Sequence, residues 1–426
     1  MVIVNAAIRV AALMALVATA AVAQEHQHAG HGQSRLVVAR EGSGTSWLPE
    51  QTPMLGWHRP VGPWEVMVHG NLFMQFLYEG GEVHRRSRQG GSINWLMGMA
   101  RRPAGRGQVG IRAMFSAEPW TIPGCGYPDL LATGETCDGD TIHDRQHPHD
   151  LFMELAADYT RPLRGDIRWQ LYAGLAGEPA LGPPGFPHRL SAFPNPVAPI
   201  GHHWLDATHI TYGVITTGIA SRTWNVEASA FNGREPDERR YDFDLAAVDS
   251  VSARVTVAPL PAVVMQVSAG RLNDAESHGS LPRTDVTRAT ASVTFHRQVR
   301  QGVPYSARNS WATTIAWGLN VETNDSTHAG LVESSFATPA GHTVFGRVEM
   351  AGKPAHDLHV HESTDVFTVG KLQLGYTRYF APRRGVEAGI GGLVSGSAVP
   401  DYLGPRYGGR LIPGFGIFLT LRPSGT

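Results

Sequence analysis

The chain has 426 residues, and its 36 Lys and Arg residues nearly balance 37 Asp and Glu residues, giving a formal net charge of −1. With 17% charged and 42% hydrophobic residues, the composition excludes a disordered chain, a nucleic-acid-binding protein and a strongly acidic protein. The 49 Gly and 29 Pro residues are too many for a helical protein and imply many tight turns, and two cysteines exclude a disulfide framework.

The chain begins with a segment typical of a cleaved secretory signal peptide, residues 1–23. Arg9 is its only charge, an apolar run follows, and the segment ends in the Ala-Val-Ala pattern that signal peptidase cuts. The apolar run is too short to span a membrane, and no later stretch resembles a transmembrane helix. Residues 24–59 contain no convincing series of strands, so we expect them to form a flexible, His-containing periplasmic lead.

From Trp64 onward the sequence alternates between apolar and polar residues, which is the period of a β-strand. Segments with this pattern recur to the end of the chain and give sixteen candidate strands. They cover residues 64–78, 92–101, 107–120, 150–161, 166–176, 207–219, 223–232, 250–258, 262–272, 286–297, 308–320, 328–338, 342–351, 364–378, 385–396 and 409–422.

One face of these segments is aliphatic and aromatic, as in Trp311, Ile315 and Trp317, and the opposite face carries charged residues. In a barrel, the charged set would line the lumen. Its mixed signs argue against strong ion selectivity, and its members can equally pair with one another and satisfy the interior. The predicted lumen residues are Glu154, Asp158, Arg168, Glu227, Arg254, Arg288, Arg347, Glu349, Lys371 and Glu387.

The connections alternate between long and mostly very short, with local exceptions near 298–307 and 321–327. Short periplasmic turns, long external loops and an even strand count are typical of an up-and-down antiparallel transmembrane β-barrel. Over residues 60–422 the chain resembles the bacterial outer-membrane porin-like barrels, and we assign residues 60–426 to this domain. The resemblance implies a location in the outer membrane, with lipid and lipopolysaccharide as partners. Loop arginines are candidates to contact lipopolysaccharide phosphates, namely Arg85, Arg86, Arg88, Arg239 and Arg240.

Twenty histidines are many for this length, and the first group directly follows the predicted cleavage site. If cleavage follows Ala23, His26 becomes the third residue of the mature chain and could chelate Cu(II) or Ni(II) in a square plane with the amino terminus, alongside His28 and His31. The alternative is a polar leader that is rich in histidine by chance.

Three predicted external loops carry the other histidines together with carboxylates. The first holds His143, Asp144, His147, His149 and Asp150, the second holds His188, His202, His203, Asp206 and His209, and the third holds His356, Asp357, His359, His361 and Glu362. Imidazole and carboxylate ligands suit Zn, Cu, Ni or Fe, but no spacing matches a known zinc motif. Two alternatives remain open: these residues solvate long loops, or Asp144, Arg145 and Asp150 form a salt-bridged plug where loop 121–149 folds into the barrel. Cys125 and Cys137 are placed to close the tip of that loop as a disulfide.

The sequence therefore predicts an outer-membrane barrel for passage or binding of small solutes, with transition-metal ions as the sharper hypothesis and Cu, Zn or Ni as candidate ions. The first alternative is a plugged, non-conducting barrel that acts as a surface receptor or structural protein, and the second is a secreted soluble β protein. We do not expect an enzyme, because phosphate-binding loops and a Gly-x-Ser-x-Gly motif are absent and Ser292 lies too far from His296 along its strand for proton transfer.

Overall fold

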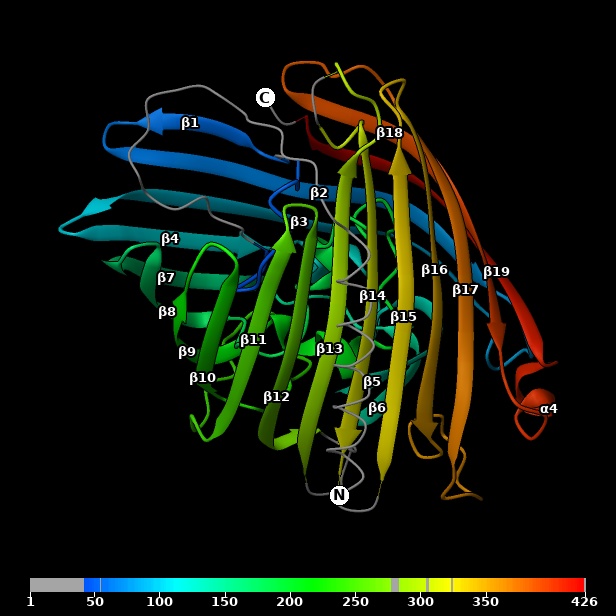
Figure 1. Ribbon diagram of the computed structural model, residues 1–426. Helices are drawn as coiled ribbons and strands as arrows, with labels where there is room; N and C mark the ends of the chain where they lie inside the picture. The colour runs from blue at the N-terminus through cyan, green and yellow to red at the C-terminus, as the bar shows by residue number, and fades with distance from the viewer. Residues whose placement is uncertain (1–41, 54, 277–282, 304–305, 323–324, 425–426) are drawn as a thin grey trace. The chain divides into compact units, whose positions relative to one another are not determined.

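A computed structural model describes residues 42–53, 55–276, 283–303, 306–322 and 325–424 (Figure 1). The predicted signal peptide and the leader histidines His26, His28 and His31 lie outside these residues. In the described part of the chain, no helix is both long and apolar enough to cross a membrane.

Sixteen strands form one closed antiparallel ring, and each predicted segment corresponds to one of them. The last strand pairs with the first, from Leu421 opposite Leu72 to Gly414 opposite Glu79, which closes the barrel and leaves it no open edge there. The wall strands are β2 (Trp64–Glu79), β3 (Ser87–Ala104), β4 (Gly107–Phe115), β7 (Phe152–Arg164), β8 (Ile167–Gly177), β9 (Thr211–Ala220), β10 (Trp224–Phe231), β11 (Ser250–Leu260), β12 (Val263–Glu276), β13 (Thr284–Gln298), β14 (Ser310–Val321), β15 (Ser326–Ala337), β16 (His342–Pro354), β17 (Val366–Tyr379), β18 (Val386–Ala398) and β19 (Leu411–Pro423).

The apolar side chains of the alternating pattern point out of the barrel. In β19, Ile417 is 60% exposed whereas its neighbour Phe418 is 3% exposed. An apolar outer surface around a closed ring is what lipid requires, because every backbone amide and carbonyl in the hydrocarbon layer needs a partner within the sheet. The barrel is therefore of the transmembrane, outer-membrane kind, and the alternative of a soluble sheet sandwich is wrong.

Two rims follow from the connections. The long-loop rim carries 80–86, 116–151, 178–210, 232–249, 355–365 and 399–410, the last of which contains the short helix α4 (Gly404–Tyr407). The opposite, short-turn rim carries tight turns such as 105–106, 165–166 and 261–262. The longer connection 299–309 interrupts the short-turn series, as the sequence indicated.

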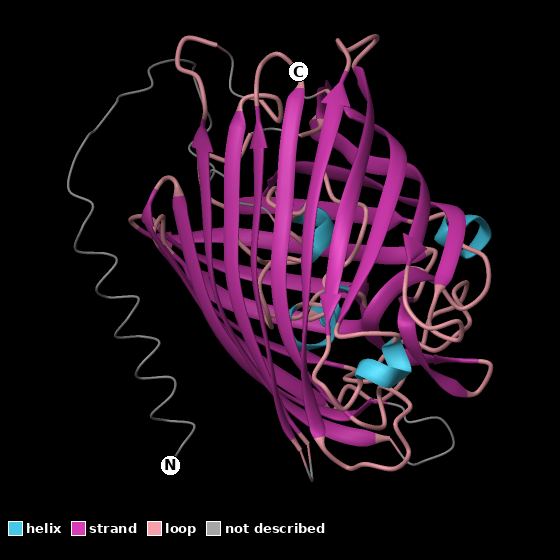
Figure 2. Ribbon diagram, turned by 90° about the vertical axis from the view of Figure 1, so that its right-hand side faces the viewer, coloured by secondary structure: helices cyan, strands magenta, loops and turns pink. Residues whose placement is uncertain are grey.

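Two of the long connections fold into the barrel, and we call them together the plug: residues 116–151 and 178–210. The first contains α2 (Glu118–Thr121) and the hairpin of β5 (Tyr127–Cys137) and β6 (Asp140–Gln146). The second contains η1 (Phe186–His188), α3 (His202–Leu205) and η2 (Ala207–His209). Figure 2 shows loops (pink) and short helices (cyan) within the ring of strands (magenta). Strand β4 ends five residues earlier than predicted, since α2 begins there with Pro119 in its first turn.

The inward face of the wall is not uniformly polar, which differs from the prediction. Phe73 and Leu77 of β2 point inward and pack with Tyr127 and Val197 of the plug. Leu130, Leu131 and Ile200 of the plug likewise pack against inward side chains of β17 and β19. Burial of this apolar surface holds the plug in place, because each Å² removed from water contributes about 25 cal/mol.

The described residues of the predicted periplasmic lead, 42–53 and 55–59, contact the barrel. Trp47 is buried with Ala220, Ala258 and Val264 near the short-turn rim. Thr45 Oγ1 accepts a 3.0 Å hydrogen bond from Arg254. Residues 57–61 form a further strand, β1 (Trp57–Val61), that pairs with the start of β2.

Candidate functional site: a histidine cluster in the plug

Five histidines meet inside the barrel, and we call them the histidine cluster: His147, His149, His202, His203 and His209. The first two follow β6, the next two lie in α3, and the last lies in η2. All five are less than 10% exposed. Neighbouring ring centroids are 5.0 to 6.2 Å apart, with Phe186 packed between three of the rings.

This arrangement corrects the prediction that the first two histidine loops stand at the external rim. Loops of this length enter the lumen because they carry apolar residues such as Leu130, Leu131 and Ile200, which pack against the wall. The cluster histidines are therefore buried, and the alternative that they solvate exposed loops is wrong for them.

Each imidazole of the cluster is anchored at Nδ1. His149 donates to Glu118 Oε1 at 2.9 Å and His203 donates to Glu235 Oε1 at 2.7 Å. His202 donates to Asp206 Oδ1, and His209 donates to the Asp206 carbonyl, both at 2.8 Å. His147 makes a longer 3.3 Å contact with the Pro148 carbonyl.

The opposite nitrogen of four of these rings has no hydrogen-bond partner among the described residues. These are the buried Nε2 atoms of His147, His149, His203 and His209. His147 Nε2 lies 3.2 Å from Glu135 Oε1, outside hydrogen-bond geometry. Three of the four residues, His147, His149 and His209, line one small cavity together with Asp150 and Arg240.

Burial keeps several of these rings neutral. It lowers the pKa of His202 to about 4, although Asp206 opposes this shift. It also lowers the pKa of His147 and of His209 well below the ordinary value. Burial alone would raise the pKa of Asp206, but Arg189 and His202 lower it below its usual range. Neutral imidazoles are the form that binds metal ions.

The cluster is held by two ion-pair networks. Arg240 pairs with Glu135 and, at 3.3 Å, with Asp150, whose other oxygen accepts a 2.7 Å hydrogen bond from Tyr212. Arg189 pairs with Asp206 and, at 2.6 Å, with Glu333 of β15, which ties the plug to the wall. Buried pairs of this kind need both partners, because a single buried charge is costly.

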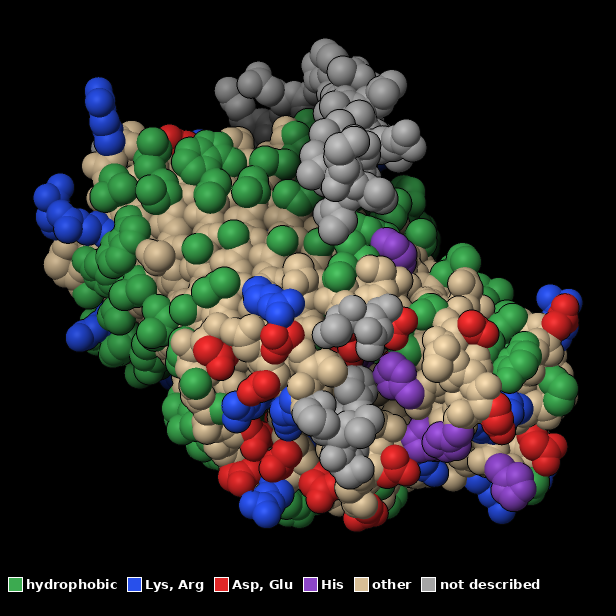
Figure 3. Space-filling model, turned by 90° about the horizontal axis from the view of Figure 1, so that it is seen from below, with side chains coloured by type: hydrophobic (Ala, Val, Ile, Leu, Met, Phe, Trp, Pro, Cys, Tyr) green, Lys and Arg blue, Asp and Glu red, His purple; other side chains and the backbone are tan. Residues whose placement is uncertain are grey.

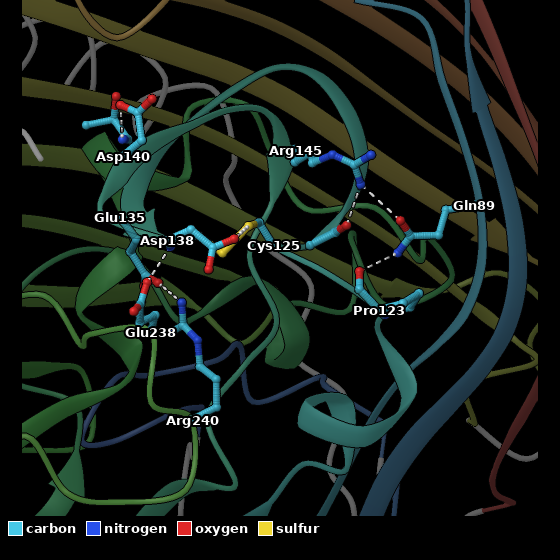
Figure 4. The surroundings of a disulfide bond; sticks show 12 residues. Gln89, Pro123, Cys125, Glu135, Asp138, Asp140, Arg145, Glu238 and Arg240 are labelled. Carbon is cyan, nitrogen blue, oxygen red and sulfur yellow. Dashed lines mark hydrogen bonds and ion pairs between the residues drawn. A yellow bond between two sulfur atoms is a disulfide. The ribbon is translucent and has the colours of Figure 1, made fainter.

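A disulfide joins Cys125 and Cys137 at the end of the β5–β6 hairpin (Figure 4). In the same view Arg240 reaches Glu135, and the backbone amide of Asp138 donates to Glu238 at 2.6 Å. Arg145 donates to Gln89 and to the Gly126 carbonyl rather than to an acidic residue of the plug. The predicted salt-bridged plug therefore exists with other partners: Asp144 pairs with Arg85 and Asp150 with Arg240.

Gly134 allows strand β5 to approach the ring of His203 closely. Its φ is +121°, and a Cβ at this position would lie 2.2 Å from the ring of His203. Only glycine combines this backbone conformation with such a close approach.

A second, smaller group forms at the long-loop rim, away from the cluster. The rings of His143 and His359 are 3.9 Å apart, and His361 lies 5.9 Å from His359. His359 also contacts Thr141 Oγ1 at 2.9 Å. His356 pairs with Asp357 at 3.1 Å. Figure 3 shows histidine and acidic side chains gathered on this end of the barrel.

The predicted lumen charges do point inward, and they are paired or covered. Lys371 lies 2.6 Å from both Glu79 and Asp129, the latter in the plug. The remaining contacts are Arg254 with Glu227, Arg347 with Glu333 and Glu349, Arg288 with Asn320, Glu387 with Arg422 and Arg308, Arg112 with Glu154 and Asp158, and Arg168 with the Ser221 carbonyl and the Trp47 ring.

Among the described residues, two groups of three metal-ligand side chains have ligand atoms within 4.8 Å of one another. One contains Asp138 and the two disulfide cysteines, and the sulfur atoms of these cysteines are already bonded to each other. The other contains Asp237, Asp242 and Asp244 in an outer loop, where the Asp244 carboxylate already accepts from the Asp237 amide.

Sequence reasoning did not find the carboxylates that orient the cluster, Glu118 and Glu235. Each lies in a loop with several other acidic residues, and no spacing distinguishes it from a solvated residue. The Pro after Glu118 was the available signal, since it marks a helix start that turns the carboxylate toward the cluster.

Comparison with known proteins gives a general likeness only. No protein-family model and no curated protein matches the sequence. Solved structures similar in fold include OmpF of Salmonella typhi in complex with daunomycin (TM-score 0.49, 9% identity, covering 86% of this chain and 100% of that chain). They also include an anion-selective porin from Comamonas acidovorans (TM-score 0.48, 10% identity, 84% and 99%) and a loop-deleted OmpT of Vibrio cholerae (TM-score 0.47, 10% identity, 84% and 99%). At these values none of them bears on the function of this chain.

Proposed function

We propose that this outer-membrane barrel binds small solutes within its plug and lets them pass when the plug shifts. The observation that carries the proposal is the set of polar contacts in the seam between plug and wall, which accompany the apolar contacts there. Lys371 of the wall holds Asp129 of the plug, Arg189 of the plug holds Glu333 of the wall, and Ser191 of the plug lies 2.7 Å from Thr314. Polar surfaces that separate can be rehydrated, whereas a purely apolar core strongly resists water.

For the solute we propose a transition-metal ion, with Cu, Zn and Ni as candidates. Support comes from the buried imidazoles of the histidine cluster and, at the rim, from His143, His359 and His361. The leader histidines His26, His28 and His31 remain a separate predicted binding segment.

For the membrane partners we propose lipid along the apolar wall and lipopolysaccharide at the long-loop rim. Arg86, Arg88 and Arg239 are exposed and suit bidentate phosphate contacts. Arg85 and Arg240 are not proposed for this role, because their guanidinium groups are engaged in ion pairs with Asp144 and Glu135.

The test is planar-bilayer conductance with a plug that can be locked. The double variant Ser191→Cys/Thr314→Cys replaces two short side chains in contact across the seam, a geometry that suits a disulfide. We expect the wild type to conduct, the oxidised variant to conduct at least about tenfold less, and reductant to restore conductance. Wild type with reductant controls for the disulfide between Cys125 and Cys137.

Two results would decide against the proposal. Equal conductance of the locked and reduced variant would mean that solutes bypass the plug. No conductance by the wild type at any voltage would favour the alternative, a closed barrel that acts as a surface receptor or structural protein.

A further inference from the structure

We infer that one first-row transition-metal dication binds in the plug between His149 and His209, at the cavity that His147 and Asp150 also line. The inference deepens the proposed function and rests on it only for the idea that the plug is where solutes bind. This site is one among the many histidines of the chain. An ion bound there would join the two segments of the plug, because His149 lies in residues 116–151 and His209 in residues 178–210.

The hydrogen bonds decide which nitrogen of each ring is available. The partner of His209 Nδ1 is a carbonyl oxygen, which only accepts, so Nδ1 must carry the proton. In the neutral ring Nε2 then holds a lone pair. His149 has the same tautomer, since its Nδ1 donates to the Glu118 carboxylate.

Both Nε2 atoms are buried without a hydrogen-bond partner among the described residues. Leaving a buried polar atom unpaired costs about 1–3 kcal/mol, and the buried Nε2 atom of His203 is without a hydrogen-bond partner as well. Such a concentration of lone pairs in one place calls for a ligand that accepts electron pairs, and a metal cation is one.

The remainder of the arrangement is that of a prepared metal site. An imidazole that donates its Nδ1 proton to a carboxylate or carbonyl is fixed in orientation and is a stronger ligand at Nε2. The His149 and His209 ring centroids are 5.3 Å apart and their planes are nearly perpendicular. Two imidazoles that share a tetrahedral ion at bond lengths of about 2.0–2.1 Å place their centroids about 5 Å apart.

The third and fourth ligands come from the same cavity. His147 Nε2 and the Asp150 carboxylate both line it, but no three histidine or carboxylate ligand atoms of this cavity lie within 4.8 Å of one another among the described residues. Binding therefore requires His147 and Asp150 to move toward the pair, and Asp150 to exchange a contact with Arg240 or Tyr212 for the ion. Nitrogen ligands select Zn, Cu or Ni over Ca or Mg, which prefer sets of oxygen atoms.

The experiment is titration of the full-length, detergent-solubilised barrel with Zn2+, Ni2+ and Cu2+ against a coloured chelator. We expect one tight site in the wild type. His149→Gln and His209→Gln should each weaken it by at least about 100-fold, and Glu118→Gln, a positioning variant, should weaken it about 10–100-fold.

His296→Gln is the matched control. His296 is also buried. Its Nδ1 atom shares a hydrogen bond with Thr52, and its Nε2 atom has no hydrogen-bond partner among the described residues. Because His296 lies outside the cluster, its replacement should leave the metal site intact. A triple variant of His26, His28 and His31 to Gln should also keep the site. Gel mobility of unboiled samples establishes that each variant is folded, and metal should raise the unfolding temperature of the wild type but not of His209→Gln.

The inference is overturned if no ion binds the wild type tightly, if the site survives in folded His149→Gln and His209→Gln, or if only the leader variant loses it. Conductance of the metal-free wild type is a separate measurement. A barrel that binds metal at the cluster but never conducts would refute the proposed passage and leave this site standing.

Discussion

Glu333 is shared by two buried arginines, Arg189 at 2.6 Å and Arg347 at 3.0 Å, and all three side chains are at most 1% exposed. Glu333→Gln keeps the shape but removes the charge that both guanidinium groups face. We expect it to lower the free energy of unfolding by about 3–5 kcal/mol, since each buried cation loses compensation. Urea titration in lipid vesicles measures this value.

Asp285→Asn is the control for that substitution. Arg271 and Asp285 form a 2.6 Å pair on the surface, where water screens both charges. The control should leave the free energy of unfolding nearly unchanged. Equal effects of the two substitutions would contradict the assignment of Glu333 as the junction between plug and wall.

Glu178, at the start of the second plug segment, gives the barrel a pH dependence. Burial raises its pKa to about 8, against the opposing influence of Arg254. Because the folded-state pKa exceeds the unfolded value of about 4.3, this group favours the folded state least at high pH: its destabilising effect grows as pH rises from about 4.3 to 8.

Glu178→Gln removes that titration. We expect the variant to gain stability relative to wild type between pH 5 and pH 8.5, as measured by denaturation midpoints at the two values. A difference between variant and wild type that does not change with pH would show that Glu178 does not titrate in this range.

At the scale of single residues, the sequence predicted which charged residues face inward better than it predicted the partners of those residues. The alternating pattern predicted that Arg254, Arg347 and Lys371 face inward, and all three are buried inside the barrel. It did not identify Glu333 and Asp129 as partners of these charges, or Glu118 as a partner of the cluster. Contacts between residues far apart in the chain leave no local signal, and these pairs are 144, 242 and 31 positions apart.

At the scale of elements, the β5–β6 hairpin depends on the disulfide between Cys125 and Cys137, which closes a loop with a sequence separation of 12. A cross-link over a loop of about 15 residues stabilises by about 3 kcal/mol through the unfolded state. Cys125→Ser/Cys137→Ser should therefore leave the wall intact and expose the hairpin to protease.

Limited proteolysis of the folded barrel checks this prediction, with gel mobility of unboiled samples as the control for the wall. We expect cleavage within residues 121–149 to become at least about tenfold faster. Unchanged cleavage would mean that packing of Leu130 and Leu131 alone holds the hairpin in place.

The wall strands were predictable because the period of two is sustained and lipid imposes it on every strand. The elements that were missed are short and locally irregular. Strand β1 spans only Trp57–Val61 and contains a proline, and β5 contains left-handed residues such as Leu131 and Glu135 that interrupt its alternation. Strand β9 begins at Thr211 rather than 207, because η2 occupies Ala207–His209.

At the scale of the whole molecule, the sequence predicted a barrel with long loops on one rim but left open where those loops go. Their inward path depends on packing between segments distant in the chain, such as Val197 against Phe73 and Phe345. The same packing brings the histidines of two loops into one cluster, and it separates them from His143 and His359 at the rim.

The central claim is that the second plug segment lies against the inner wall, and cysteine cross-linking in intact outer membranes tests it most directly. Ser191→Cys/Thr314→Cys pairs two residues in contact across the seam, whereas Ser191→Cys/Ile315→Cys pairs the same plug position with the adjacent, outward and 52% exposed residue of β14. After mild oxidation and peptide mass spectrometry, we predict a cross-link between positions 191 and 314 and none between 191 and 315. No cross-link at 314, or equal yields at the two positions, would contradict a plug seated inside the barrel.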